Sequence, residues 1–112
     1  MAFTGNEHHD ISFEDAGVMT KRYRDKMSTN PPSSWLKGGF FGRAAIETLL
    51  AQENCVGIRY YYGLDENNIQ VLVLVGTDSD EDDLVGKDNQ CMEMSVPCPD
   101  RCGTNNILNS GT

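Results

Sequence analysis

Long apolar runs are missing from this sequence, and its first ten residues lack the basic start and apolar stretch of a secretory signal peptide. A membrane-spanning helix needs about 18 or more consecutive apolar residues, so no such helix is expected. Proteins without a secretory signal usually keep their thiols reduced. We therefore expect a cytoplasmic protein.

Catalytic motifs are missing as well. The two histidines, His8 and His9, both fall in the polar leader, and no motif of a serine hydrolase, zinc protease or P-loop enzyme is present. An enzyme needs an activated nucleophile or an acid–base pair. Catalysis is therefore the least favoured class of function, and no catalytic residue is predicted.

Basic residues are scarce in the second half of the chain. Residues 1–59 hold seven acidic and seven basic residues, whereas residues 60–112 hold ten acidic and two basic residues, and the net charge is −8. Repulsion of phosphates disfavours direct binding to nucleic acid or to an anionic membrane surface. A basic protein partner would be attracted, although an acidic surface also serves solubility alone.

The 112 residues suffice for one domain with a modest core. Two runs of β-branched and aromatic residues, 56–62 and 69–75, flank a turn at 64–68 and predict an antiparallel hairpin. Residues 71–75 are apolar at every position, so this strand should be covered on both faces. The alternation of residues 91–96 predicts a short third strand.

Two helices are expected before the hairpin. Ser12 is a good N-cap, Asp15 sits at the N3 position, and Asn30-Pro31-Pro32 ends the first helix. Its apolar face comprises Phe13, Ala16, Met19, Tyr23 and Met27. The second helix is expected over residues 41–53, with Asn54 as the C′ residue.

The predicted fold is α+β, with two N-terminal helices packed on a small antiparallel sheet built from the central hairpin plus a short third strand. We expect a flexible leader at residues 1–10, a single domain at 11–103 and a polar tail at 104–112.

Residues 33–43 place three glycines and two consecutive phenylalanines directly before the second helix, a composition that predicts a turn. Lys37 and Arg43 beside a helix N-terminus could hold an anion, whereas the aromatic side chains could instead plug the core. The consecutive tyrosines at 60–62 put phenol rings on both faces of their strand, as in a peptide-docking surface or an ordinary strand. The candidate binding residues are Lys37, Phe40, Phe41, Arg43, Arg59 and Tyr61.

Three of the four cysteines cluster near the end of the chain. Cys91, Cys98 and Cys102 could hold zinc with Cys55 or one of the histidines as the fourth ligand, although a C-x3-C spacing lies at the edge of zinc-ligand spacings. Redox chemistry and unliganded thiols are the alternatives.

A second candidate for metal binding is the acidic run after the hairpin. Asp78, Asp80 and Asp82 alternate as in a calcium loop. Asp83 and Asn89 stand where an EF-hand has glycine and glutamate, so a solvated turn is expected instead.

Several short motifs of the chain resemble those of a group of small bacterial proteins of the bacteroidete type. The motifs are Met19-Thr20, Tyr23-Arg24, Phe41-Gly42, Gly57-Ile58-Arg59, Tyr61-Tyr62-Gly63 and Cys98-Pro99 with Cys102. The resemblance implies a bacterial cytoplasmic protein and carries no activity or catalytic residue.

The sequence thus predicts a small binding or accessory protein that acts through contacts with a protein partner or a second copy. A small zinc–thiolate protein is the alternative. An acidic inhibitor that imitates nucleic acid is the third hypothesis.

Overall fold

The computed structural model describes residues 2–29, 35–86, 89–93, 96–98 and 103–110, and of residues 96–98 it describes the backbone. The chain forms two compact units. Unit 1 comprises Met1–His8 and Phe41–Ser95, and unit 2 comprises His9–Phe40 and Val96–Thr112. Helices and antiparallel sheet occur together, so the predicted α+β class is confirmed.

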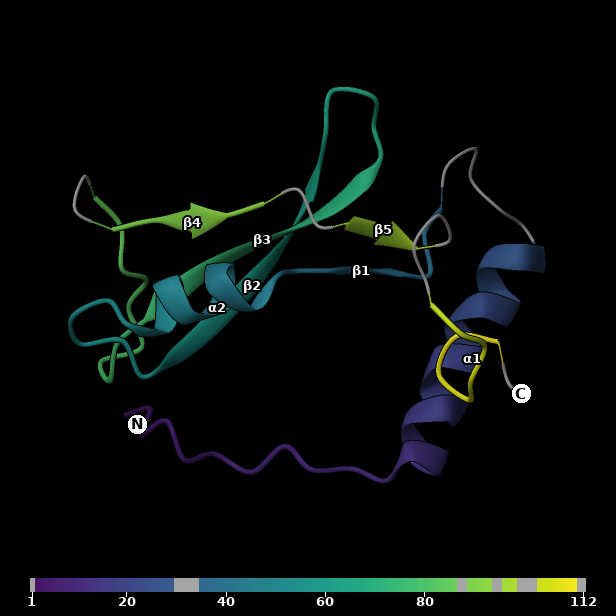
Figure 1. Ribbon diagram of the computed structural model, residues 1–112, viewed down its shortest axis with the longest axis horizontal. Coiled ribbons are helices and arrows are strands. Elements are labelled where there is room, and N and C mark those ends of the chain that lie inside the picture. The colour runs from purple at the N-terminus through teal and green to yellow at the C-terminus, as the bar shows by residue number, and fades with distance from the viewer. Residues whose placement is uncertain (1, 30–34, 87–88, 94–95, 99–102, 111–112) are drawn as a thin grey trace. The chain divides into compact units, whose positions relative to one another are not determined.

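Unit 1 contains a three-stranded antiparallel sheet (Figure 1). Its strands are β2 (Gly57–Leu64), β3 (Gln70–Thr77) and β4 (Cys91–Met92), in the order β2-β3-β4. Strands β2 and β3 occupy the two runs predicted as a hairpin, and Tyr61 pairs with Val73 near their middle. Asp65 stabilises the turn, since its Oδ1 accepts hydrogen bonds from the backbone N–H groups of Asn67 and Ile69.

Helix α2 (Arg43–Leu50) packs on one face of β2 and β3. Leu49 is fully buried, and Leu74 and Val75 of β3 are nearly so. The chain just after α2 approaches β3 closely at Gly76, where an added Cβ would lie 2.8 Å from Nε2 of Gln52. The β3 segment predicted to be covered on both faces is buried at one end and half-buried at residues 71–73.

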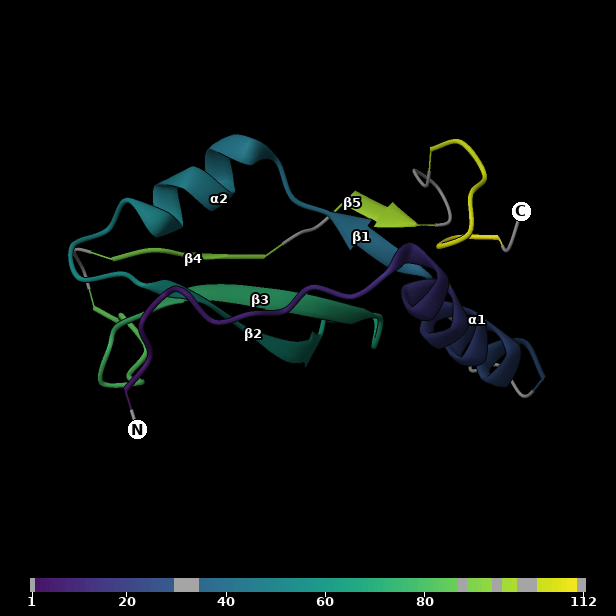
Figure 2. The ribbon, with the colours of Figure 1, turned by 90° about the horizontal axis from the view of Figure 1, so that it is seen from below.

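The first residues of the chain lie against the other face of the hairpin, opposite α2 (Figure 2). The backbone N–H of Phe3 donates to the carbonyl of Ser79 over 3.0 Å. The Phe3 ring lies 5.7 Å from the guanidinium carbon of Arg59, a cation–π contact. The part of the predicted leader that precedes residue 9 therefore contributes to the packing of unit 1.

Unit 2 contains helix α1 (Phe13–Thr29) and a short ribbon in which β1 (Gly38–Phe40) pairs with β5 (Val96–Cys98). The predicted N-cap is confirmed, because Oγ of Ser12 accepts a hydrogen bond from the N–H of Asp15 over 3.0 Å. The tail docks on α1 at the buried Gly17, where an added Cβ would lie 2.6 Å from Cγ1 of Ile107.

Three local predictions are wrong in detail. The third strand of the hairpin sheet occurs as β4, but residues 91–96 do not form one strand: β4 pairs with β3, whereas β5 pairs with β1. Period-two alternation cannot reveal that a strand changes its partner. The stretch before α2, predicted as a turn, includes β1.

The second helix is also shorter than predicted. It has Gly42 as N-cap and Ala51 as C-cap. Asn54 therefore lies beyond the C′ position, in a turn where its φ is 69°. Among the helices of the described residues, none is long and apolar enough to cross a membrane.

Candidate functional site

The most exposed apolar side chains of unit 1 include a row along β2. Side chains of alternate residues share a face of a strand, so Tyr60, Tyr62 and Leu64 lie on the same face as Ile58. Ile58 is half-buried, whereas Tyr60, Tyr62 and Leu64 expose 57%, 70% and 67% of their surface. We call these three residues the tyrosine row. The hairpin turn extends beyond α2 in Figure 1, which explains why the helix leaves this end of the face uncovered.

The two tyrosines of the row contact each other. Their ring centroids lie 5.7 Å apart with an interplanar angle of 80°, an edge-to-face arrangement. Neighbouring rings that hold each other in place lose little further freedom when a partner packs on them. The row therefore forms a semi-rigid apolar surface with phenol groups.

Some backbone N–H and C=O groups of β2 point outward beside the tyrosine row. The carbonyl of Gly76 accepts a hydrogen bond from the N–H of Leu84, so Gly76 directs its backbone groups away from β2. Gly76 pairs with Ile58, and antiparallel pairs alternate between bonded and non-bonded residues. It follows that Ile58, Tyr60 and Leu64 direct their N–H and C=O groups outward. Within the described part of the chain, no hydrogen-bond partner meets these groups.

Two predicted binding residues meet on the other face of β2. Nη1 of Arg59 donates to Oδ1 of Asp83 over 2.7 Å and to the carbonyl of Glu81 over 3.2 Å. The Tyr61 hydroxyl donates to the second carboxylate oxygen of Asp83. The hydrogen bond that Arg59 donates to Asp83 raises the pKa of Arg59 further above its ordinary value. This cation is therefore engaged inside unit 1 and is poorly placed to capture an external anion.

The other predicted binding residues are divided between the two units. Lys37 and the exposed Phe40 belong to unit 2, whereas Phe41 and Arg43 belong to unit 1. Nε of Arg43 lies 4.0 Å from Oε1 of Glu47 on the next turn of α2. A carboxylate beside the guanidinium weakens the predicted anion site.

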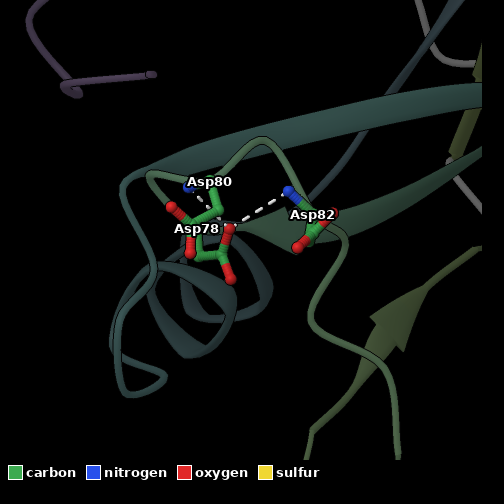
Figure 3. A group of neighbouring side chains, drawn as sticks. All are labelled: Asp78, Asp80 and Asp82. Carbon is green, nitrogen blue, oxygen red and sulfur yellow. Dashed lines mark hydrogen bonds between the residues drawn. The ribbon is translucent and has the colours of Figure 1, made fainter. Parts of the chain in front are cut away.

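The acidic run after β3 folds into a tight turn (Figure 3). Oδ1 of Asp78 accepts hydrogen bonds from the N–H groups of Asp80 and Asp82, over 2.9 and 3.0 Å. One ligand atom from each of the three carboxylates lies within 4.8 Å of the others. These two backbone contacts account for the turn without an ion, as expected for an aspartate that caps its own loop.

The cysteines predicted to share a zinc ion are only partly described. Cys55 and Cys91 are free thiols. Sγ of Cys55 lies on the α2 side of the sheet, next to Gly76, whereas Cys91 pairs with Val75 and so lies on the opposite face. The side chain of Cys98 and all of Cys102 lie outside the described residues.

Charge divides unevenly between the two units. Unit 1 contains twelve acidic and three basic residues, a net charge of −9, whereas unit 2 contains five acidic and six basic residues, a net charge of +1. The excess acidity of the whole chain therefore belongs to the unit that carries the tyrosine row. This division was hidden in the sequence, because unit 1 is built from two separate segments.

No protein-family model matches the chain, and no curated protein or solved structure does either.

Proposed function

We propose that this chain is a small binding or accessory protein that acts through protein–protein contacts and carries out no catalysis. The observation that carries the proposal is the outer edge of β2, eight residues long and flanked by the exposed tyrosine row. Tyrosine suits such a surface because its ring buries apolar area while its hydroxyl stays hydrated or bonds to the partner.

The charge of unit 1 supports a basic protein as the partner. A net charge of −9 repels nucleic acid and speeds the approach of a positively charged surface. We place this activity in the cytoplasm, the compartment in which cysteines stay reduced. Packing of α1 on the sheet stays a prediction from the sequence.

The experiment that tests the proposal is capture with matched baits. The full chain, the double variant Tyr60→Ser/Leu64→Ser and the control Val85→Ser are immobilised and exposed to the same bacterial extract. Val85 is 75% exposed and lies in the loop after β3, away from the tyrosine row. We expect a protein that the chain and the control retain and the double variant loses.

That protein is identified by mass spectrometry, purified and titrated with the chain by calorimetry. The proposal requires binding of the pure partner that the double variant weakens by at least about tenfold. Absence of any protein that distinguishes the baits overturns it. The zinc alternative has its own readout: about one zinc ion per chain with few titratable thiols would replace the binding role by a metal–thiolate protein.

A further inference from the structure

The outer edge of β2 also indicates how a partner binds. We infer that the partner supplies an extended, basic segment that adds to this edge as a further strand of the sheet. This inference rests on the proposed function and specifies the partner segment of the same site. It names both the geometry of the bound segment and its charge.

The backbone pattern of β2 provides the first argument. Ile58, Tyr60 and Leu64 direct N–H and C=O groups outward, and in the described structure these groups lack partners. An extended segment laid along this edge satisfies them in the way that neighbouring strands satisfy one another. Its alternate side chains then lie beside the tyrosine row, which gives them apolar contacts.

The two edges of the sheet differ in a way that singles out β2. Proteins usually protect sheet edges by keeping the strand short or by adding proline, lysine or a bulge. The edge at β4 is two residues long, whereas β2 has eight residues and contains neither proline nor lysine. Its one cation, Arg59, is turned to Asp83 on the other face. Of the two edges, β2 is therefore the one suited to strand addition.

The acidic residues at both ends of β2 indicate the charge of the partner segment. At one end of the strand lies the hairpin turn with Asp65 and Glu66, and at the other end, beyond the Gly57–Thr77 pair, lies the acidic turn that begins at Asp78. Eight residues of strand span about 26 Å at roughly 3.3 Å per residue. The complementary segment therefore has about eight residues, apolar side chains at alternate positions, and lysine or arginine near both ends.

The same charge argues against a second copy of this chain as the occupant. Pairing β2 with β2 of another copy brings together two units of net charge −9. Like-charge contact at an interface is costly, whereas a basic segment gains from the same field. A heterologous basic partner is therefore favoured over a homodimer.

Selection from a random peptide library tests this inference. The library is displayed on phage and selected on the immobilised full chain at low salt, with the Val85→Ser variant as a second positive bait. Selected peptides are synthesised and their affinities measured for the chain, for Tyr60→Ser and for Leu64→Ser. Circular dichroism checks that each variant is folded, and two variants are used so that one misfolded protein does not decide the result.

We expect enriched peptides with lysine or arginine near both ends and alternating apolar residues. In an added strand, every second peptide amide donates to β2. N-methylation of those amides should weaken binding by at least about tenfold, whereas N-methylation of the intervening amides should not. Replacement of lysine by glutamate should abolish binding, and higher salt should weaken it. On binding, the amide protons of Ile58 and Tyr60 should become protected from exchange.

Four results overturn the inference, and they differ in what they leave standing. If Tyr60→Ser and Leu64→Ser weaken binding of the peptides but N-methylation of neither set of alternate amides does, strand addition is wrong and the proposed binding role stands. If the enriched peptides are neutral or acidic, the basic partner is wrong. If no selected peptide depends on Tyr60 or Leu64, or if light scattering shows a dimer that Tyr60→Ser dissociates, the proposed heterologous partner fails as well.

Discussion

Nη1 of Arg59 donates a hydrogen bond to Oδ1 of Asp83 over 2.7 Å, and this contact ties the first strand of the hairpin to the loop that follows the second. Both side chains are partly shielded from solvent, with 31% and 23% of their surface exposed. Because Asp83 also accepts a hydrogen bond from Tyr61, a single carboxylate holds two residues of β2. The contact fixes one face of the hairpin and leaves the tyrosine row on the other.

Replacement of Asp83 by alanine should lower the midpoint of thermal unfolding, since Arg59 then loses its anionic partner. The control Asp80→Ala should change the midpoint little, because Asp80 is exposed and its side chain makes no such contact. A double-mutant cycle with Arg59→Met measures the coupling between the two residues. A coupling free energy of zero would contradict the structural role of the pair.

The importance of Asp83 was not predictable from the sequence. Five acidic residues stand between positions 78 and 83, and which of them meets Arg59 depends on the bridge that pairs Thr77 with Asp83. Local signals were more informative: the hairpin runs and the Ser12 cap depend on neighbouring residues, and both occur as predicted. The β1–β5 ribbon joins residues more than fifty positions apart, a pairing that no local pattern encodes.

The core of unit 1 depends strongly on Leu49. This side chain is fully buried between α2 and the sheet, whereas its neighbour Leu50 is 48% exposed. Leu49→Ala should reduce the free energy of unfolding by about 2–5 kcal/mol, because it removes buried methyl groups and leaves a cavity. Leu50→Ala should cost less than about 1 kcal/mol. Urea unfolding of both variants checks the difference, and equal losses would contradict the packing of α2 described above.

The acidic turn is predicted to depend on one carboxylate. Asp78→Ala removes the oxygen that accepts two backbone N–H groups and should lower the free energy of unfolding by about 1 kcal/mol. Asp78→Asn keeps a carbonyl oxygen at the same place and should retain most of the stability. If calcium ions stabilise the chain and Asp78→Asn removes that effect, the three carboxylates bind a cation in addition to forming the turn.

The first residues of unit 1 should respond to acid through Glu7. Its carboxylate accepts hydrogen bonds from the N–H groups of Thr4 and Gly5, over 2.8 and 2.9 Å. The hydrogen bond from Thr4 lowers the pKa of Glu7 below its ordinary value of 4.5. The folded state therefore favours the ionised form, so the stabilisation is present above pH 4.5 and is lost as the pH falls through the lower folded value.

Amide chemical shifts of Thr4 and Gly5, followed by NMR from pH 7 downward, report this transition. They should move together with a midpoint below that of an unperturbed glutamate. The Glu7→Gln variant serves as the control, since its side chain does not ionise and the Thr4 shift should then show no such step. A midpoint at or above the ordinary value would contradict the hydrogen-bonded turn.

The C-terminal tail docks on α1 at Gly17. Gly17→Ala should therefore have opposite effects on stability in the original chain and in the Ile107→Ala variant. Alanine stabilises a helix interior by about 1 kcal/mol relative to glycine. At Gly17, however, the added methyl group would lie 2.6 Å from Cγ1 and 3.1 Å from the carbonyl oxygen of Ile107. Gly17→Ala alone should therefore displace the tail and speed hydrogen exchange at residues 104–110.

The matched background is Ile107→Ala, which removes Cγ1 and Cδ1, the two side-chain atoms that the methyl group would meet, and leaves the carbonyl oxygen 3.1 Å away. There Gly17→Ala should raise the free energy of unfolding by at most about 1 kcal/mol, because the gain in helix propensity then outweighs the one close contact that remains. Val18→Ala, at a site 55% exposed, controls for general effects on the helix. If Gly17→Ala stabilises the chain equally in both backgrounds and leaves exchange of the tail unchanged, the tail does not pack at Gly17 in solution. Opposite signs in the two backgrounds would show that this glycine is needed for the close approach of the tail rather than for flexibility of the helix.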